Sequence, residues 1–156
     1  MFESNMITVV IDPEVDNKAV VSKAIAVALV SRAKLEFVYS EYVHYLEDGY
    51  FYDPVVAKTL REEHSEVNAR KAEELAQLAR DAGLSVNVVA LWGSPAHRSI
   101  IERIIARQPS LVIKSTSHHN RLARIFLANE DWELVRHCPV PLLLVKGLPW
   151  SEPPNF

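Results

Sequence analysis

The chain has 156 residues, is 49% hydrophobic, and carries 17 basic and 20 acidic side chains for a formal net charge of −3. This length suits one domain, and the charge balance lacks the basic excess typical of nucleic-acid-binding proteins. The N-terminal MFESNM has no signal-peptide pattern, no apolar run reaches membrane-spanning length, and the single Cys138 suits a reducing compartment. We therefore expect a cytoplasmic protein with no membrane insertion and no nucleic-acid partner.

The predicted elements alternate between strand and helix along the whole chain. Short runs of aliphatic residues are typical of buried strands, and apolar residues at helical spacing predict the helices between them. In chain order we expect strand 7–11, helix 18–32, strand 35–39, helix 54–82, strand 86–91, a helix from 95 that ends before Pro109, strand 111–113, helix 130–137 and strand 141–146.

The helix over 54–82 is the longest predicted element, and Gly83 follows it at the position of a C-cap glycine. The expected buried stripe of this helix consists of Val56, Leu60, Val67, Leu75 and Leu78. At the next helix, Ser94 is expected to be the N-cap, with Pro95 at the first helical position.

This alternation predicts an α/β fold with a doubly wound, five-stranded parallel sheet covered by helices on both faces, which makes three layers. In such folds ligands bind beyond the carboxyl ends of the strands. The residues expected at those ends are Asp12, 39–41, 91–94, 115–117 and Lys146.

Three motifs give the sequence a family resemblance. The first strand ends in Asp12, Gly93-Ser94-Pro95-Ala96 follows the third strand, and His137-Cys138-Pro139-Val140-Pro141 leads into the apolar last strand LLLVK. In this order and spacing the chain resembles the universal stress protein family over essentially its whole length. The resemblance implies strand order 3-2-1-4-5 and dimers that form through the last strand.

The sequence is more similar to the first half of tandem, E-type members of that family. Lys114, Asp131-Trp132 and Pro149-Trp150 carry this second resemblance. It implies a universal stress protein-like domain over 1–147, with 148–156 as a proline-rich tail or the start of a linker to a second domain.

ATP-binding members of the family carry Gly-x2-Gly-x9-Gly-Ser/Thr after the fourth strand. The resemblance places Ser115, His118 and Ala128 at the three glycine positions and Asn129 at the Ser/Thr position. Side chains at these positions would fill space that a phosphate cradle needs, and Glu130 and Asp131 put carboxylates in the first turn of the following helix. We therefore expect weak or absent ATP binding and no cofactor.

The candidate ligand-binding residues lie at the strand ends and in this loop. They are Asp12, Gly93, Lys114, Ser115, His118, Arg121 and Asn129. The resemblance places Asp12 against the adenosine end of a nucleotide, although its carboxylate could instead order the turn before Pro13. The basic loop side chains could form an anion site, or they could pair with Glu130, Asp131 and solvent.

Other chemistries fit the sequence less well. A receiver domain needs an Asp at the end of the third strand, where this chain has Leu91-Trp92-Gly93. The neighbouring His118 and His119 have no partners at metal-ligand spacing, so no metal site is predicted. No catalytic residue is assigned, and Cys138 is interpreted as a small buried residue.

Exposed apolar surface is expected at the last strand. Leu142, Leu143, Leu144 and Val145 would form an edge that pairs with a second copy or a second tandem domain. Trp92 and Trp132 are interpreted as core or interface residues, or else as walls of an apolar pocket together with the aromatic 42–53 loop.

Three hypotheses for function follow. The first is a non-enzymatic stress-response domain with a degenerate phosphate loop that holds a small ligand or none. The second is an ATP-binding or nucleotide-hydrolysing member, with His118 or His119 as base and Arg121 or Arg124 as clamp. The third is a binder of an anionic amphiphile, held between the aromatic and basic loops.

Overall fold

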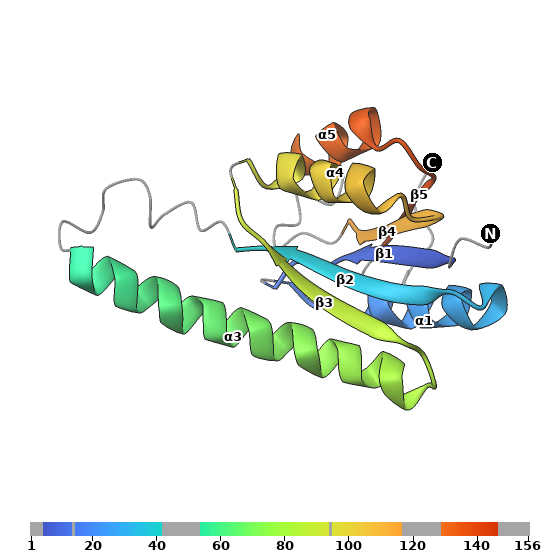
Figure 1. The fold of residues 1–156 in the computed structure, drawn as a ribbon, viewed down its shortest axis with the longest axis horizontal. Helices are drawn as coiled ribbons and strands as arrows, with labels where there is room; N and C mark the ends of the chain where they lie inside the picture. Colours follow the sequence, from blue (N-terminus) through green and yellow to red (C-terminus); the bar gives the residue numbers. More distant parts are fainter. Residues whose placement is uncertain (1–4, 14, 42–53, 94, 117–128, 147–156) are drawn as a thin grey trace, which may run out of the picture.

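The computed structural model describes residues 5–13, 15–41, 54–93, 95–116 and 129–146. Its centre is a parallel sheet of five strands in the order β3-β2-β1-β4-β5 (Figure 1), which confirms the predicted topology. The strands are β1 (Met6–Val10), β2 (Lys34–Ser40), β3 (Val86–Leu91), β4 (Leu111–Ser115) and β5 (Leu142–Val145).

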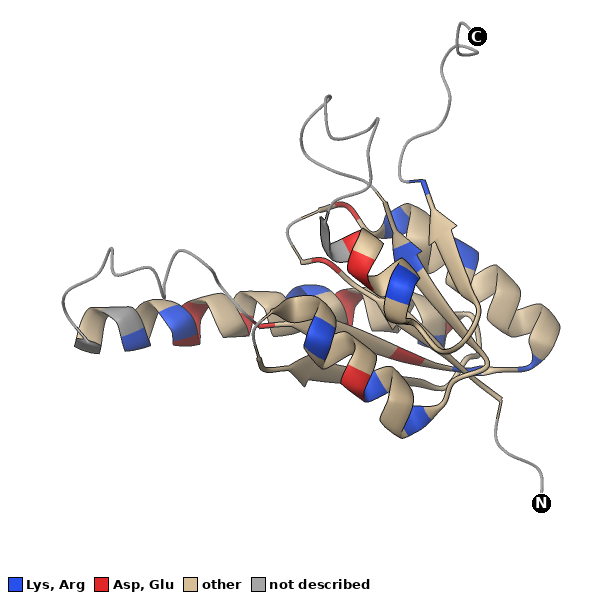
Figure 2. Ribbon diagram, turned by 90° about the horizontal axis from the view of Figure 1, so that it is seen from above, with Lys and Arg blue, Asp and Glu red and all other residues tan. Residues whose placement is uncertain are grey.

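Helices cover both faces of the sheet. The helices α1 (Lys18–Ser31) and α3 (Pro54–Asp81) lie on one face, and α4 (Ala96–Arg107) and α5 (Asn129–His137) lie on the other (Figure 1). At 1.5 Å per residue the 28 residues of α3 span about 42 Å, so this helix extends well beyond the sheet (Figures 1 and 2). Figure 2 also shows that most charged residues lie on the helices, while the strands are largely uncharged.

Each predicted strand and helix is present, with small shifts at its ends. Pro95 is the N-cap of α4 and not its first helical residue, because its ψ of 159° is extended. Its carbonyl accepts a hydrogen bond from the Arg98 N–H at 3.1 Å, as an N-cap carbonyl does. Ser94 lies outside the described residues. Gly83 has a φ of 90°, in agreement with the predicted C-cap glycine after α3.

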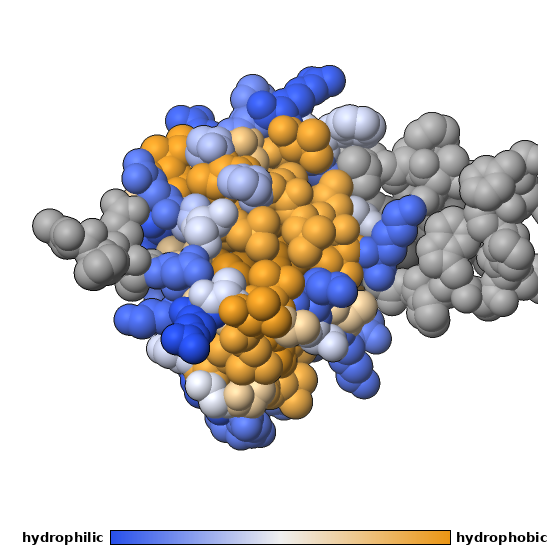
Figure 3. All heavy atoms as spheres, turned by 90° about the vertical axis from the view of Figure 1, so that its right-hand side faces the viewer, coloured by the Kyte–Doolittle hydropathy of each residue, from blue (hydrophilic) through white to orange (hydrophobic). Residues whose placement is uncertain are grey.

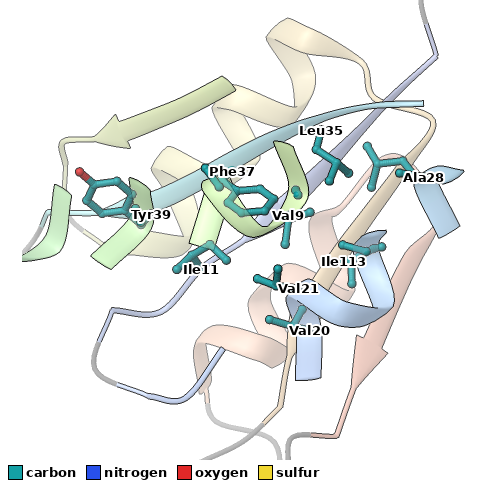
Figure 4. Close-up of a cluster of buried hydrophobic side chains, with 14 of the residues drawn as sticks. Val9, Ile11, Val20, Val21, Ala28, Leu35, Phe37, Tyr39 and Ile113 are labelled. Atoms are coloured by element: carbon teal, nitrogen blue, oxygen red, sulfur yellow. The ribbon is translucent and has the colours of Figure 1, made fainter. Parts of the chain in front are cut away.

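The alternation of side chains along β1 and β2 divides the core into two layers. Val9, Leu35 and Phe37 point toward α1 and α3 (Figure 4), and Ile7 belongs to the same cluster. Val10 and Val38 instead pack against residues of α4 and α5. The first layer is the larger one, and α1 contributes Val20, Val21, Ala24 and Ala28 to it.

The buried stripe of α3 differs from the prediction. Val56, Val67 and Leu78 are exposed, whereas the buried positions are Ala72, Ala76, Ala79 and Asn68. Alanine is small enough to let a helix lie close against a sheet, so these residues position α3 against β2 and β3.

An ion pair lies within the second layer. The Glu36 carboxylate on β2 is buried and accepts hydrogen bonds from the Arg103 guanidinium of α4, with Arg107 Nε 3.7 Å away. A buried carboxylate must be paired in this way, so α4 is held to the sheet by charge as well as by Ile100 and Ile104.

We predict that replacement of Ile104, which is fully buried, destabilises the protein far more than replacement of its neighbour. Ile104→Ala should lower the free energy of unfolding by about 2–5 kcal/mol, because it leaves a cavity between α4 and the sheet. Ile105→Ala, the same change at a side chain that is 56% exposed, is the matched control. Urea denaturation followed by circular dichroism measures both, and equal losses would contradict the layer assignment.

Candidate functional site

A cleft of about 200 Å³ opens at the carboxyl ends of the central strands. The central strand β1 pairs with β2 on one side and with β4 on the other, so the strand order reverses direction at β1. The cleft lies at this reversal point, where parallel α/β sheets commonly bind ligands. Helices α3 and α4 contribute the remaining walls. The described residues that line it are Val10, Ile11, Asp12, Pro13, Ser40, His64, Asn68, Ala96, Ile100 and Lys114.

Asp12 stands at the mouth of this cleft, in a turn that Asn17 holds. The Asn17 side chain is buried, and its Nδ2 donates to the Asp12 carbonyl at 2.7 Å and to the Val15 carbonyl at 3.0 Å. Its Oδ1 accepts from the Asp12 N–H at 3.3 Å. The amide of Asn17 therefore orders this turn through the backbone, while the Asp12 residue stays exposed beside the cleft.

Among the described residues that line the cleft, the lysine or arginine is Lys114, near the end of β4. This lysine already forms an ion pair with Asp131. Its Nζ lies 2.5 Å from Asp131 Oδ1, and the Asp131 side chain is 1% exposed. Nζ also donates to the Ser115 carbonyl at 3.2 Å. Because Asp131 belongs to the first turn of α5, the carboxylate occupies the region in which an anion would meet both the lysine and the helix N-terminus.

Other predicted site residues lie elsewhere. Gly93 and Ser115 are outside the set of described residues that line the cleft. Gly93 has a φ of 142°, and a Cβ there would lie 2.5 Å from Ser99 Oγ, so its backbone conformation accounts for the glycine. His118, Arg121 and the side chain of Asn129 lie outside the described residues.

Trp92 and Trp132 are not core residues, and the prediction that they lie at an interface stays a prediction. Trp92 is 67% exposed at the end of β3, and Trp132 is 48% exposed on α5. Cys138 is partly buried at the end of α5, where its thiol donates to the Val140 carbonyl at 3.3 Å.

Sequence reasoning missed the contribution of α3. His64 and Asn68 reach the cleft from this helix, four residues apart on the same side. They share that side with Leu60, Ala72 and Ala76, which are partly or fully buried. A polar residue at a position in register with buried residues was the signal that could have found them.

Behind the cleft, a second polar group joins β2 to α3. Glu41 is buried and accepts a hydrogen bond from Ser65 Oγ at 3.2 Å. Burial raises the pKa of the Tyr39 phenol above its ordinary value, and the negative charge of Glu41 and a hydrogen bond to it raise the pKa further. Tyr39 therefore remains neutral at physiological pH and serves as a packing and hydrogen-bonding group.

Among the described residues, no group of three or more His, Cys, Asp or Glu side chains is arranged to hold a metal ion. No helix in this part of the chain has the length and apolarity that a membrane crossing requires.

A model of the universal stress protein family matches residues 4–146. The chain is 28% identical over 144 residues to universal stress protein E of Salmonella typhi, which covers 92% of this chain and 46% of that relative. It therefore spans about half the length of the curated relatives it matches.

Two solved structures show the same fold. Universal stress protein UspA from Lactobacillus plantarum has a TM-score of 0.73 at 16% identity, covering 93% of this chain and 99% of its own. The universal stress protein of Archaeoglobus fulgidus in complex with dAMP has a TM-score of 0.66 at 14% identity, covering 94% and 100%.

We predict that the Lys114–Asp131 pair is a major contributor to stability. Lys114→Met removes the cation that lies 2.5 Å from the buried Asp131 carboxylate, which should lower the unfolding free energy by about 3–5 kcal/mol at pH 7. Lys58→Met, which removes the cation of the exposed Lys58–Glu62 pair, is the matched control and should change stability little. Chemical denaturation measures both; a Lys114→Met protein as stable as the control variant would refute the role of the pair.

Proposed function

Because this chain belongs to the universal stress protein family, we propose that it is a non-enzymatic, ligand-binding domain of the stress response. It holds a small molecule in the cleft at the strand ends and has little or no affinity for ATP. The observation that carries this proposal is the ion pair between Lys114 and Asp131, which neutralises the cation of the cleft.

The charge of the cleft supports a ligand other than a nucleoside triphosphate. A triphosphate is stabilised by cations and by free N–H groups at a helix N-terminus. Here the lysine that lines the cleft is within 2.5 Å of a carboxylate from the first turn of α5.

We further propose that β5 pairs with a second domain of the same kind, either in another copy or in a tandem protein. β5 is an edge of the sheet, and all four of its apolar residues are partly exposed. Figure 3 faces this side of the molecule and shows hydrophobic side chains gathered across its centre. The neighbouring helices add Leu29, Val30 and Val135 to the exposed apolar surface. An apolar sheet edge of this kind is stabilised when another chain covers it.

For ATP, we predict no saturable binding of Mg-ATP to the 156-residue chain at concentrations up to about 1 mM, a level that corresponds to at most about 4 kcal/mol of binding free energy. Asp131→Asn releases Lys114 and should increase the affinity for inorganic phosphate and for Mg-ATP. Asp16→Asn, at an exposed position, is the matched control. Isothermal titration calorimetry measures the binding, with thermal unfolding to verify that each variant is folded. Micromolar binding of Mg-ATP by the wild-type protein would overturn the proposal.

For pairing, we predict that the isolated chain self-associates and that Val30→Glu weakens this association at least about tenfold, since it places a charge in an apolar contact. Val30 is 88% exposed, so the substitution should not affect folding. Val55→Glu, at a 72% exposed residue on the far end of α3, should leave association unchanged. Sedimentation equilibrium measures the association constant of each protein. Pairing through this face would be contradicted by a chain that remains monomeric at about 100 μM, or by equal effects of the two substitutions.

A further inference from the structure

Three large apolar side chains form an exposed stripe along α3. Val56, Val67 and Leu78 are 44%, 40% and 51% exposed. They follow one another at intervals of eleven residues, which is close to three full turns, so all three lie on one side of the helix. The alanines that anchor α3 lie on another side, since Ala72 is about 140° around the helix from Val67. A helix uses an apolar stripe to pack against another element, and this stripe faces solvent.

A groove of about 310 Å³ lies beside the C-terminal end of the stripe, between α3 and the turn that leads into α1. Lys71 Nζ donates to the Pro13 carbonyl at 3.2 Å, so this turn is tied to α3 and the groove is present before any partner binds. Leu78 belongs to both the stripe and the groove, so a partner that covers one can also fill the other. The apolar residues that line the groove are Ile11, Pro13, Val15, Leu75 and Leu78.

The stripe and its neighbouring charges are arranged symmetrically about Val67. Val56 and Leu78 stand eleven residues before and after it. Glu63 and Arg70, both exposed, also stand before and after Val67 and lie on one flank of the stripe, because seven residues are close to two turns. When two identical helices pack antiparallel about a two-fold axis, the same flanks meet. An axis at Val67 would therefore place Val56 of each copy near Leu78 of the other, and Glu63 opposite Arg70.

The length of α3 fits this arrangement. Its first turns extend beyond the sheet of their own copy (Figure 1). In an antiparallel pair those turns would lie along the C-terminal half of the second α3, where Val56 reaches the groove beside Leu78. The two sheets would not collide, because the stripe and the anchored side of the helix face different directions.

We infer that the exposed stripe of α3 binds a second copy of this chain as an antiparallel helix pair, with Val67 at the two-fold axis. The apolar residues supply the attraction, and the opposite charges of Glu63 and Arg70 set the direction of the helices. A contact one helix wide belongs to the small, weak class of interfaces, below about 1,200 Å². It is separate from the pairing proposed for β5, and the two contacts together would join copies into assemblies larger than a dimer.

A cross-link at the axis tests this contact directly. Val67→Cys, made in a Cys138→Ser background, brings two thiols together only if the helices pair as described. We expect air oxidation at about 100 μM to convert most of this variant into a covalent dimer on a non-reducing gel. Ala69→Cys in the same background is the matched control, because Ala69 is exposed on a different side of α3. It should give at least about tenfold less dimer.

An exchange of charges tests the direction of pairing. Glu63→Arg and Arg70→Glu should each weaken association at least about threefold, since each sets like charges opposite one another, and the double variant should restore it. All three are made in a Val30→Glu background, which removes the contribution of the β5 face. Sedimentation equilibrium at up to about 1 mM measures the association, and thermal unfolding verifies that each variant is folded.

Three results would overturn the inference. They are equal cross-linking of Val67→Cys and Ala69→Cys, a Val30→Glu protein that is monomeric at about 1 mM, and a double charge variant that associates no better than the single variants. Failure of the pairing proposed for β5 has a different signature, namely a wild-type association that Val30→Glu leaves unchanged and Glu63→Arg weakens.

Discussion

The contact between Lys114 and Asp131 constrains much of this structure. It joins the end of β4 to the first turn of α5 through a nearly inaccessible carboxylate, so it fixes where α5 begins relative to the sheet. The same contact determines the electrostatics of the cleft, because the ammonium group faces a charge of the protein's own. A stabilising ion pair and a binding site for polyphosphate would need the same lysine, and the geometry favours the ion pair.

Most of the fold could be predicted because its signals are local. Five apolar runs separated by helical patterns indicate a parallel sheet, and the family resemblance supplied the strand order that the structure confirms. The end of β4 was missed because Lys114 and Ser115 are polar and ended the apolar run too early. The buried side of α3 was also missed: its alanines pack against the sheet, whereas the larger Val67 and Leu78, which have the stronger hydrophobic signal, face solvent.

The site was only partly predictable, for a geometric reason. Asp12 comes two residues after β1, and Lys114 lies near the end of β4. The ends of parallel strands meet at one edge of the sheet, so both residues were expected at the cleft. His64 and Asn68 belong to a helix, and their position depends on how far that helix extends and at what angle it crosses the strands. Spacing along the sequence does not contain that information. The turn at Asp12 shows a similar limit, since Asn17 precedes a helix but its amide turns back to the loop.

The length of α3 has a consequence for the dynamics of the molecule. Its C-terminal half is anchored by Ala72, Ala76 and Ala79 against strands, whereas its first turns extend beyond the sheet (Figure 1). Backbone amides in the anchored half exchange with solvent only when the core opens, whereas amides in the first turns can exchange through independent fraying of the helix end. His64 and Asn68 lie between the two regimes. A molecule bound to both side chains should therefore slow amide exchange toward the free end of the helix, so that binding changes the rigidity of α3.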